Sequence, residues 1–515
     1  MVSAALKSPI AFDEAIAAYE AGQREQLLPA LRATVAANTP DARLWHLNGL
    51  VLRELDRREE ALPSLRKAAR LAPGSAKIAY ALALTLYEAG LPSVEAFGQS
   101  LRLAPGDTEI VGGLATALVA EGEPEAAIAG LEKILARSPQ WIGGQVLLAK
   151  LRWAQGERQG FDRGFEAAVE AIPQNLDFWR EWIIALIHAE YFESASRVIS
   201  MGRVAIGDQP LFAANEAIIA AETGESERAE LLFAPFIDLD DASVQVRRVR
   251  HYLRSGQPEE ANRIIEQWTD RPESFMFWPY ASIAWRMVDD PRWAWLESDE
   301  RFVGIYDIAD RLPPLDLLAG RLRQLHTLSG QPLEQSLRGG TQTGADIFTH
   351  IDPVLVGLRE AIRTVVAEHV AKFPEFDEHH PLLGRSREKI GFSGAWSVRL
   401  QGGGYHANHI HPLGWISSAL YIVLPPDLGK DEAGFLTLGD AKTPTLNIET
   451  PPMRTIEPKP GRLVLFPSYM WHGTRPFTEG ERITVAFDVA VRESSQTDGN
   501  HENSAEFKAG QVPFA

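Results

Sequence analysis

The sequence has 515 residues and no cysteine, which excludes several kinds of site at once. Without a thiol there is no disulfide, no thiolate nucleophile, no cysteine-ligated zinc and no iron–sulfur cluster. Any bound metal must therefore be held by histidine, carboxylate or solvent ligands.

Long apolar runs and an excess of basic residues are missing as well. A stretch such as "WIIALI" at 182–187 is far shorter than the roughly 20 residues needed to cross a bilayer. The first 22 residues lack the basic segment and the long apolar core of a signal peptide. With 69 acidic and 51 basic residues, the net charge of −18 would repel nucleic-acid phosphates. We expect a cytoplasmic protein with no membrane or nucleic-acid partner.

The first half of the chain repeats with a period near 34 residues. Prolines recur at positions 40, 73, 105, 139 and 173, and small residues such as Gly49 and Ala61 precede them at fixed offsets. Proline ends a helix, and small residues let two helices approach closely. The pattern resembles the tetratricopeptide repeat. The resemblance implies stacked helix pairs whose groove binds a peptide or protein segment, with self-association into a homo-oligomer as the main alternative.

The period is lost from about residue 269. Residues 268–299 contain five of the 13 tryptophans and read as short helices broken by prolines, which is typical of a packing layer between domains. The Gly/Thr-rich segment 336–344 is expected to be a turn region. Residues 352–370 have apolar side chains at helical spacing and predict a helix.

After residue 390 the period becomes two, which predicts short strands in a sandwich or barrel. The predicted strands are 395–401, 415–425, 434–439, 462–467 and 482–491. Two of them have one apolar face and one face with polar groups. Ser417 and Tyr421 share the second face of 415–424, and Arg482, Thr484 and Asp488 share that of 482–491. Because burying polar groups is costly, such faces favour a ligand inside the barrel.

Histidines cluster beside these strands. Alternate residues of an extended segment point the same way, so His409 and His411 can share a metal. His472 follows 61 residues later, and then come Arg482 and Thr484.

A histidine pair, a distant histidine and Arg-x-Thr resemble the double-stranded β-helix oxygenases that use Fe(II) and 2-oxoglutarate. The segments "WSVRL", "GGYHANHIHPLGWISSALYI" and "GRLVLFPSYMWHGT" are most similar to bacterial members that carry N-terminal tetratricopeptide repeats.

The resemblance implies an α+β multidomain protein with an all-α solenoid at 10–268, a helical connector at 269–345, a jelly-roll oxygenase domain at 346–495 and a polar tail at 496–515. It implies a catalytic set of His409, His411, His472 and Arg482. The three histidines would bind Fe(II). Arg482, with Thr484, Tyr421 and Ser417, would bind 2-oxoglutarate, with O2 as the second co-substrate. Oxidative decarboxylation of the oxo-acid would yield succinate and CO2.

The sequence departs from the commoner pattern at His411, where many relatives have aspartate. Three histidines could bind the metal. Alternatively His409 and His472 bind it alone with water, or His406 joins them. Asp440 is another candidate carboxylate. Asp488 shares the face of Arg482, and an ion pair between these two would compete with the co-substrate.

We therefore expect a hydroxylase that acts on a side chain of a peptide or protein held by the repeats. One alternative is a non-catalytic interaction protein with a structural or sensing barrel. The other is a three-histidine dioxygenase of the cupin type that needs no 2-oxoglutarate.

Overall fold

The computed structural model describes residues 8–443 and 446–491, which form two compact units. The first unit comprises residues 8–134 and 344–359, and the second comprises the remaining described residues from 135 to 343 and from 360 to 491. No helix within these described ranges is long and apolar enough to span a membrane.

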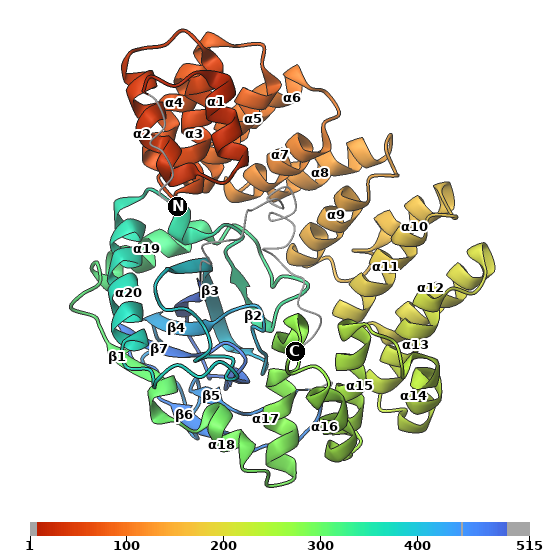
Figure 1. Ribbon diagram of the computed structural model, residues 1–515. Coiled ribbons are helices and arrows are strands. Elements are labelled where there is room, and N and C mark those ends of the chain that lie inside the picture. The colour runs from red at the N-terminus through yellow and green to blue at the C-terminus, as the bar shows by residue number, and fades with distance from the viewer. Residues whose placement is uncertain (1–7, 444–445, 492–515) are drawn as a thin grey trace. The chain divides into compact units, whose positions relative to one another are not determined.

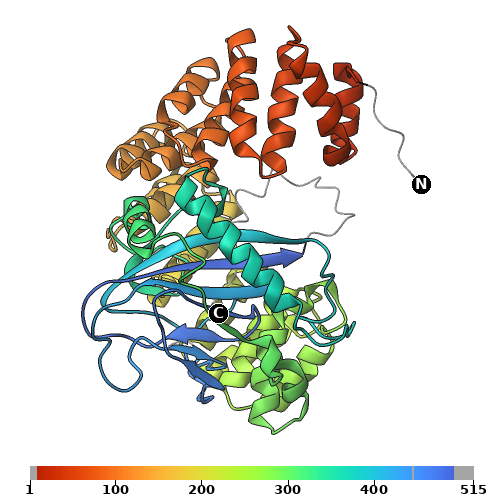
Figure 2. The ribbon, with the colours of Figure 1, turned by 90° about the vertical axis from the view of Figure 1, so that its left-hand side faces the viewer.

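The first unit is built from paired helices that follow the proline period. Its helices are α1 (Phe12–Glu20), α2 (Arg24–Ala36), α3 (Ala42–Glu54), α4 (Arg58–Leu71), α5 (Ala76–Glu88), α6 (Val94–Leu103), α7 (Thr108–Ala120) and α8 (Pro124–Leu135). The pairs stack one beside the next (Figure 2). Pro73 and Pro105 follow the ends of α4 and α6, as predicted. A Cβ on Gly49 would lie 2.5 Å from the Leu65 side chain, so the close packing of α3 on α4 requires glycine there.

The paired helices continue in the second unit. They are α9 (Ile142–Ala154), α10 (Arg163–Ala171), α11 (Leu176–His188), α12 (Phe192–Ile206), α13 (Pro210–Glu222), α14 (Ser226–Phe233), α15 (Ala242–Arg254) and α16 (Pro258–Glu266). Further helices of this unit are α17 (Trp278–Met287), α18 (Arg292–Glu297) and α19 (Leu315–Leu325). Helix α20 (Pro353–Val370), whose residues are divided between the two units, matches the helix predicted at 352–370.

Two antiparallel sheets form the jelly roll of the second unit (Figure 1). The strands are β1 (Gly304–Asp307), β2 (Leu337–Gln342), β3 (Ile390–His406), β4 (Ile416–Val423), β5 (Leu436–Leu438), β6 (Arg454–Ile456), β7 (Arg462–Pro467), β8 (His472–Thr474) and β9 (Arg482–Val491). The larger sheet has the order β1-β7-β4-β9-β3-β2, and the smaller has the order β6-β5-β8. Buried side chains from both sheets, including Tyr421, Leu438 and Phe466, pack together. The α+β fold class expected from the sequence is confirmed.

All five predicted strands are present, but the predicted turn at 336–344 is wrong. Most of it is β2, an edge strand paired with β3 through a bulge between Arg338 and Gly340. A Cβ on Gly340 would lie 2.3 Å from the Arg399 carbonyl oxygen, so glycine is required by close backbone approach within a strand. Glycine composition alone does not separate this case from a turn.

The tryptophan-rich segment packs between repeat helices and the smaller sheet, as expected of a packing layer. On one side, Trp285 Nε1 donates to Asn262 Oδ1 of α16 at 2.9 Å. On the other side, Trp471 Nε1 donates to the Pro279 carbonyl oxygen at 3.0 Å. Figure 1 shows α17 and α18 beside the strands of the smaller sheet.

The domain boundaries at 268, 345 and 495 stay predictions. Two strands of the larger sheet, β1 and β2, lie before residue 346. The predicted polar tail at 496–515 lies outside the described residues.

Candidate active site

Backbone pairing brings the distant histidines together. His409 and His472 form a β-bridge in which each amide donates to the other's carbonyl oxygen, at 2.8 and 2.9 Å. The His411 amide donates to the Ser468 carbonyl oxygen at 2.9 Å. The segment that follows β3 is therefore fixed beside β8, although 61 residues separate His411 from His472.

The three imidazoles face one another. Each of His409, His411 and His472 offers one ring nitrogen, and these three nitrogens lie within 4.8 Å of one another. The ring centroids are 4.1 Å apart for His409 and His472, 5.0 Å for His409 and His411, and 5.2 Å for His411 and His472. This spacing suits three nitrogen ligands on one face of a single metal ion.

Hydrogen bonds fix the tautomer of each ring. His409 Nδ1 lies 2.9 Å from the Ala407 carbonyl oxygen, and His472 Nδ1 lies 3.0 Å from that of Met470. His411 Nδ1 lies 2.7 Å from Asp488 Oδ2. Because a carbonyl or carboxylate oxygen only accepts, each Nδ1 must carry the proton. The Nε2 lone pairs then remain available for a metal.

Burial and charge set the protonation of the cluster. Burial, reinforced by the neighbouring imidazoles, holds the pKa of His409 and of His472 well below 6.5, so both rings are neutral near pH 7. Burial acts in the same direction on His411, but the Asp488 carboxylate outweighs it and raises the pKa of His411 above its ordinary value. Two rings are ready to bind a cation, and the third has an anionic neighbour.

Asp488 contacts His411 and does not pair with Arg482. Its Oδ1 accepts a hydrogen bond of 2.6 Å from Ser417 Oγ, and its Oδ2 accepts a hydrogen bond from His411 Nδ1 at 2.7 Å. The expected alternative of an Asp488–Arg482 ion pair is therefore wrong. Six residues of extended β9 separate the two by about 20 Å, so sharing a face did not bring them together.

A buried cation lies further along the same face. Arg482 is 2% exposed, and its guanidinium packs 4.9 Å from the centroid of the Tyr421 ring. Arg482 Nη1 donates to the Gly434 carbonyl oxygen at 2.8 Å, and Thr484 pairs in register with Tyr421. Arg482 Nε and the Tyr421 hydroxyl are buried without a hydrogen-bond partner among the described residues. Buried polar atoms of this kind call for a ligand or water, and a carboxylate suits both.

The other candidates take different places. His406 Nδ1 lies 3.1 Å from Ser336 Oγ, and its ring stacks on that of His409 at 5.7 Å without joining the cluster of three nitrogens. Asp440 accepts a hydrogen bond from the Lys442 amide within its own loop and is not in the cluster. Ser417 lies against Asp488, so its predicted contact with 2-oxoglutarate stays a prediction.

Comparisons with known families agree with this geometry. Residues 394–488 match a family model described as "Putative 2OG-Fe(II) oxygenase", and residues 94–151 match a tetratricopeptide-repeat model. The chain therefore contains one segment similar to a 2OG-Fe(II) oxygenase domain and another similar to tetratricopeptide repeats. The oxygenase match includes all three clustered histidines, Arg482 and Asp488.

Solved structures similar to parts of the chain come from both classes. A prolyl-4-hydroxylase from Pseudomonas putida is 19% identical with a TM-score of 0.25, and the match covers 40% of this chain and 97% of that one. A 2OG-Fe(II) oxygenase-family oxidoreductase from Burkholderia pseudomallei is 11% identical with a TM-score of 0.24, and the match covers 37% of this chain and 85% of that one. YrrB, a tetratricopeptide-repeat protein, is 19% identical with a TM-score of 0.25, and the match covers 36% of this chain and 95% of that one. No curated protein matches the sequence.

Sequence reasoning missed two contacts that hold the His411 ring. Asp488 was placed on the inward face of its strand, but its partner could not be read from spacing. Trp396 of β3 stacks on the His411 ring with centroids 5.7 Å apart, and no local pattern signals that contact.

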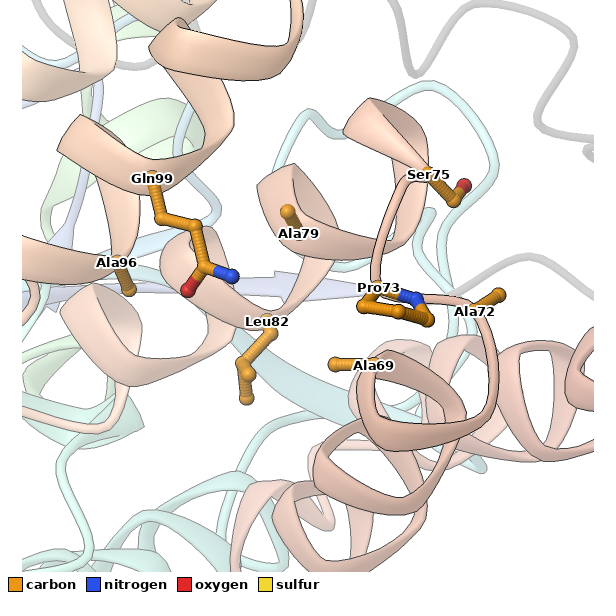
Figure 3. A pocket seen from close by; sticks show the side chains of 8 residues that line it. All are labelled: Ala69, Ala72, Pro73, Ser75, Ala79, Leu82, Ala96 and Gln99. Atoms are coloured by element: carbon orange, nitrogen blue, oxygen red, sulfur yellow. The ribbon is translucent and has the colours of Figure 1, made fainter.

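A hollow in the first unit is a poor alternative site. It lies between α4, α5 and α6, among Ala69, Ala79 and Ala96 (Figure 3). Its volume of about 20 Å³ has room for roughly one water molecule. The lining is mostly alanine and proline, without a cluster of charged groups.

Proposed function

We propose that the protein is an Fe(II)- and 2-oxoglutarate-dependent oxygenase that hydroxylates a side chain of a peptide or protein. The observation that carries the proposal is the convergence of three Nδ1-protonated histidines beside a buried arginine and an unpartnered tyrosine hydroxyl. These groups fit both the metal and the co-substrate.

His409, His411 and His472 would hold the iron. The interaction of His409 and His472 with backbone carbonyls, and of His411 with Asp488, orients all three rings before a metal arrives. When bound, Fe(II) with 2-oxoglutarate and O2 supplies the oxidative chemistry for C–H hydroxylation. The protein residues position the reactants and exclude water.

Arg482 would bind the far carboxylate of 2-oxoglutarate. Its guanidinium is buried, which strengthens a charge-assisted hydrogen bond, and its planar fork matches a carboxylate. The Tyr421 hydroxyl, which has no partner among the described residues, can donate to the same group. Thr484 lies opposite Tyr421 on the neighbouring strand and is a further candidate.

The repeats would recruit the substrate. Tetratricopeptide repeats form grooves that bind extended segments, and this chain joins them to an oxygenase domain in one polypeptide. Tethering a bound segment near the iron would raise its effective concentration there.

Anaerobic titration tests the co-substrate and metal site. Addition of Fe(II) and then 2-oxoglutarate to the full chain should produce a visible charge-transfer band, which His472→Ala abolishes. His379→Ala is the matched control because His379 is exposed and lies outside the cluster. A chain that gives no band, or a band unchanged by His472→Ala, would contradict the proposal.

Oxygen uptake separates the alternatives. The proposed enzyme consumes O2 only when 2-oxoglutarate is present. Uptake without the oxo-acid would instead identify a three-histidine dioxygenase, and metal binding with no uptake under any condition would favour a sensing barrel.

A further inference from the structure

One carboxylate lies directly behind the histidine cluster. Asp488 Oδ2 is 2.7 Å from His411 Nδ1, which leaves Nε2 of the same ring as the nitrogen available to a metal. The sequence has histidine at 411, where many members of the superfamily that it resembles have aspartate. The structure thus has a negative charge in contact with the side chain at position 411, and not at position 411 itself.

Among the described residues, His411 is the one of the three histidines whose Nδ1 has a charged partner. His409 and His472 direct Nδ1 to the neutral carbonyl oxygens of Ala407 and Met470. A carboxylate acceptor polarises an imidazole more strongly than a carbonyl does, and makes the opposite nitrogen a better electron donor to a metal. The three ligands are therefore not equivalent.

Other contacts hold Asp488 in this orientation. Ser417 Oγ donates to Asp488 Oδ1 at 2.6 Å, and the same hydroxyl lies 2.9 Å from Ser468 Oγ. The Asp488 side chain is 15% exposed, and the His411 side chain is 20% exposed. On its other face the His411 ring stacks on Trp396. The pair is held by packing and hydrogen bonds in a largely buried site, where such interactions are stronger than in water.

We propose that Asp488 is a positioning residue that supplies, through His411, the negative charge that a carboxylate ligand would otherwise bring to the metal. It fixes His411 in its Nδ1-protonated form, aims Nε2 at the cluster, and offsets the charge of a divalent ion. This inference rests on the proposed function, because it requires the three histidines to bind a metal.

Metal titration of the full chain tests the inference without turnover. Co(II) in place of Fe(II) gives visible d–d absorption that reports both affinity and ligand field. We expect Asp488→Asn to weaken Co(II) binding about 10- to 100-fold and to shift the absorption bands, because loss of such an outer partner commonly has effects of that size. Asp488→Glu retains the charge and should restore much of the affinity.

Two controls keep the result interpretable. Glu481→Gln changes a carboxylate just before β9 that pairs with Arg323 and Arg399, away from the histidines, and should bind Co(II) like the wild type. Circular dichroism and a thermal melt establish that each variant is folded. If Asp488→Asn fails to fold, the affinity and spectrum of Asp488→Glu and Ser417→Ala decide the matter. Both should differ measurably from wild type, because each alters the hydrogen bonds around the carboxylate.

The outcomes separate this inference from the proposed function. A wild-type chain that binds no Co(II), or binds it equally well as His472→Ala, overturns the metal site itself. A wild-type chain that binds Co(II) through the histidines, with Asp488→Asn matching it in affinity and spectrum, overturns only the role of Asp488.

Discussion

At the scale of single residues, two buried ionisable side chains lie in different surroundings. Arg482 is buried with a polar atom that has no partner among the described residues, which suits a site for an anion. Glu297 is also buried, at 1% exposed. Ser282 donates a hydrogen bond to its Oε2, its Oε1 has no partner among the described residues, and it lies in the tryptophan-rich packing layer. The first points to ligand binding and the second to pH-dependent stability.

Arg482→Ala should weaken 2-oxoglutarate binding by at least about 30-fold, because truncating one partner of a buried charge pair typically costs 2–5 kcal/mol. Arg482→Lys should recover only part of the affinity, since lysine lacks the planar fork. The readout is the oxo-acid concentration needed for half of the charge-transfer band. Co(II) affinity should be retained, and Arg311→Ala, which removes an exposed ion pair with Glu368, should behave like wild type. Equal oxo-acid affinity in Arg482→Ala would rule out this role.

Glu297 should make the second unit less stable as pH rises. Burial raises its pKa from 4.5 to about 7, against the opposing effects of Ser282 and Arg286. Because the folded pKa is the higher one, its stabilising contribution is complete below pH 4.5 and is lost as pH rises through 7. At about 1.4 kcal/mol per pH unit, the loss is about 3 kcal/mol. Urea unfolding at several pH values should therefore show a shallower decline for Glu297→Gln. The exposed Glu300→Gln should follow wild type, and parallel curves for wild type and Glu297→Gln would contradict the expectation.

At the scale of elements, one irregular segment connects the repeat helices to the candidate site. This strap, residues 329–338, begins where the Gly330 amide donates to the Ala154 carbonyl oxygen at 2.8 Å. Leu333 is buried in the core formed mainly by α9–α13, and Glu334 lies 3.2 Å from Lys150. Ser336 then contacts His406, whose ring stacks on that of His409 in the histidine cluster. The repeat helices of the second unit thereby support the site directly.

Removing the apolar anchor of the strap should destabilise this unit. Leu333→Ala is expected to lower the free energy of unfolding by about 2–4 kcal/mol, since it removes buried methyl groups and leaves a cavity. Leu317→Ala is the matched control, because Leu317 is 55% exposed in α19 and should change stability little. Urea melts measure both, and hydrogen exchange should show faster opening of 329–342 in Leu333→Ala. Equal melts for the two variants would mean that the strap adds no stability.

At the scale of the whole molecule, the candidate site lies within one of the two compact units. The three clustered histidines and Arg482 all belong to the second unit. A ligand that binds only the folded state adds stability to the unit that binds it, about 2.7 kcal/mol at 100 times its Kd.

Metal addition should therefore protect the second unit selectively. With saturating Co(II), hydrogen exchange should slow in β4, β8 and β9 but stay unchanged in α1–α7, and EDTA should reverse the effect. His472→Ala should abolish the protection. Protection spread equally over both units would contradict a single site in the oxygenase domain.

The sequence by itself determined the repeat period, five of the strands and the three histidines. Each of these rests on local spacing, because proline placement, alternation and the parity of His-x-His act over a few neighbouring residues. The same spacing placed Ser417, Tyr421, Arg482, Thr484 and Asp488 on inward faces.

Tertiary structure alone decided what those faces touch. Asp488 contacts His411, and Arg482 packs against Tyr421. Strand register and the β-bridge at His409 decide these contacts, because they set the distances between segments far apart in the chain. Tertiary structure also made the glycine-rich segment at 336–344 mostly a strand, since the neighbouring backbone of β3 supplies the hydrogen-bond partners. Pairing partners depend on folding energy summed over the whole domain, which local patterns do not contain.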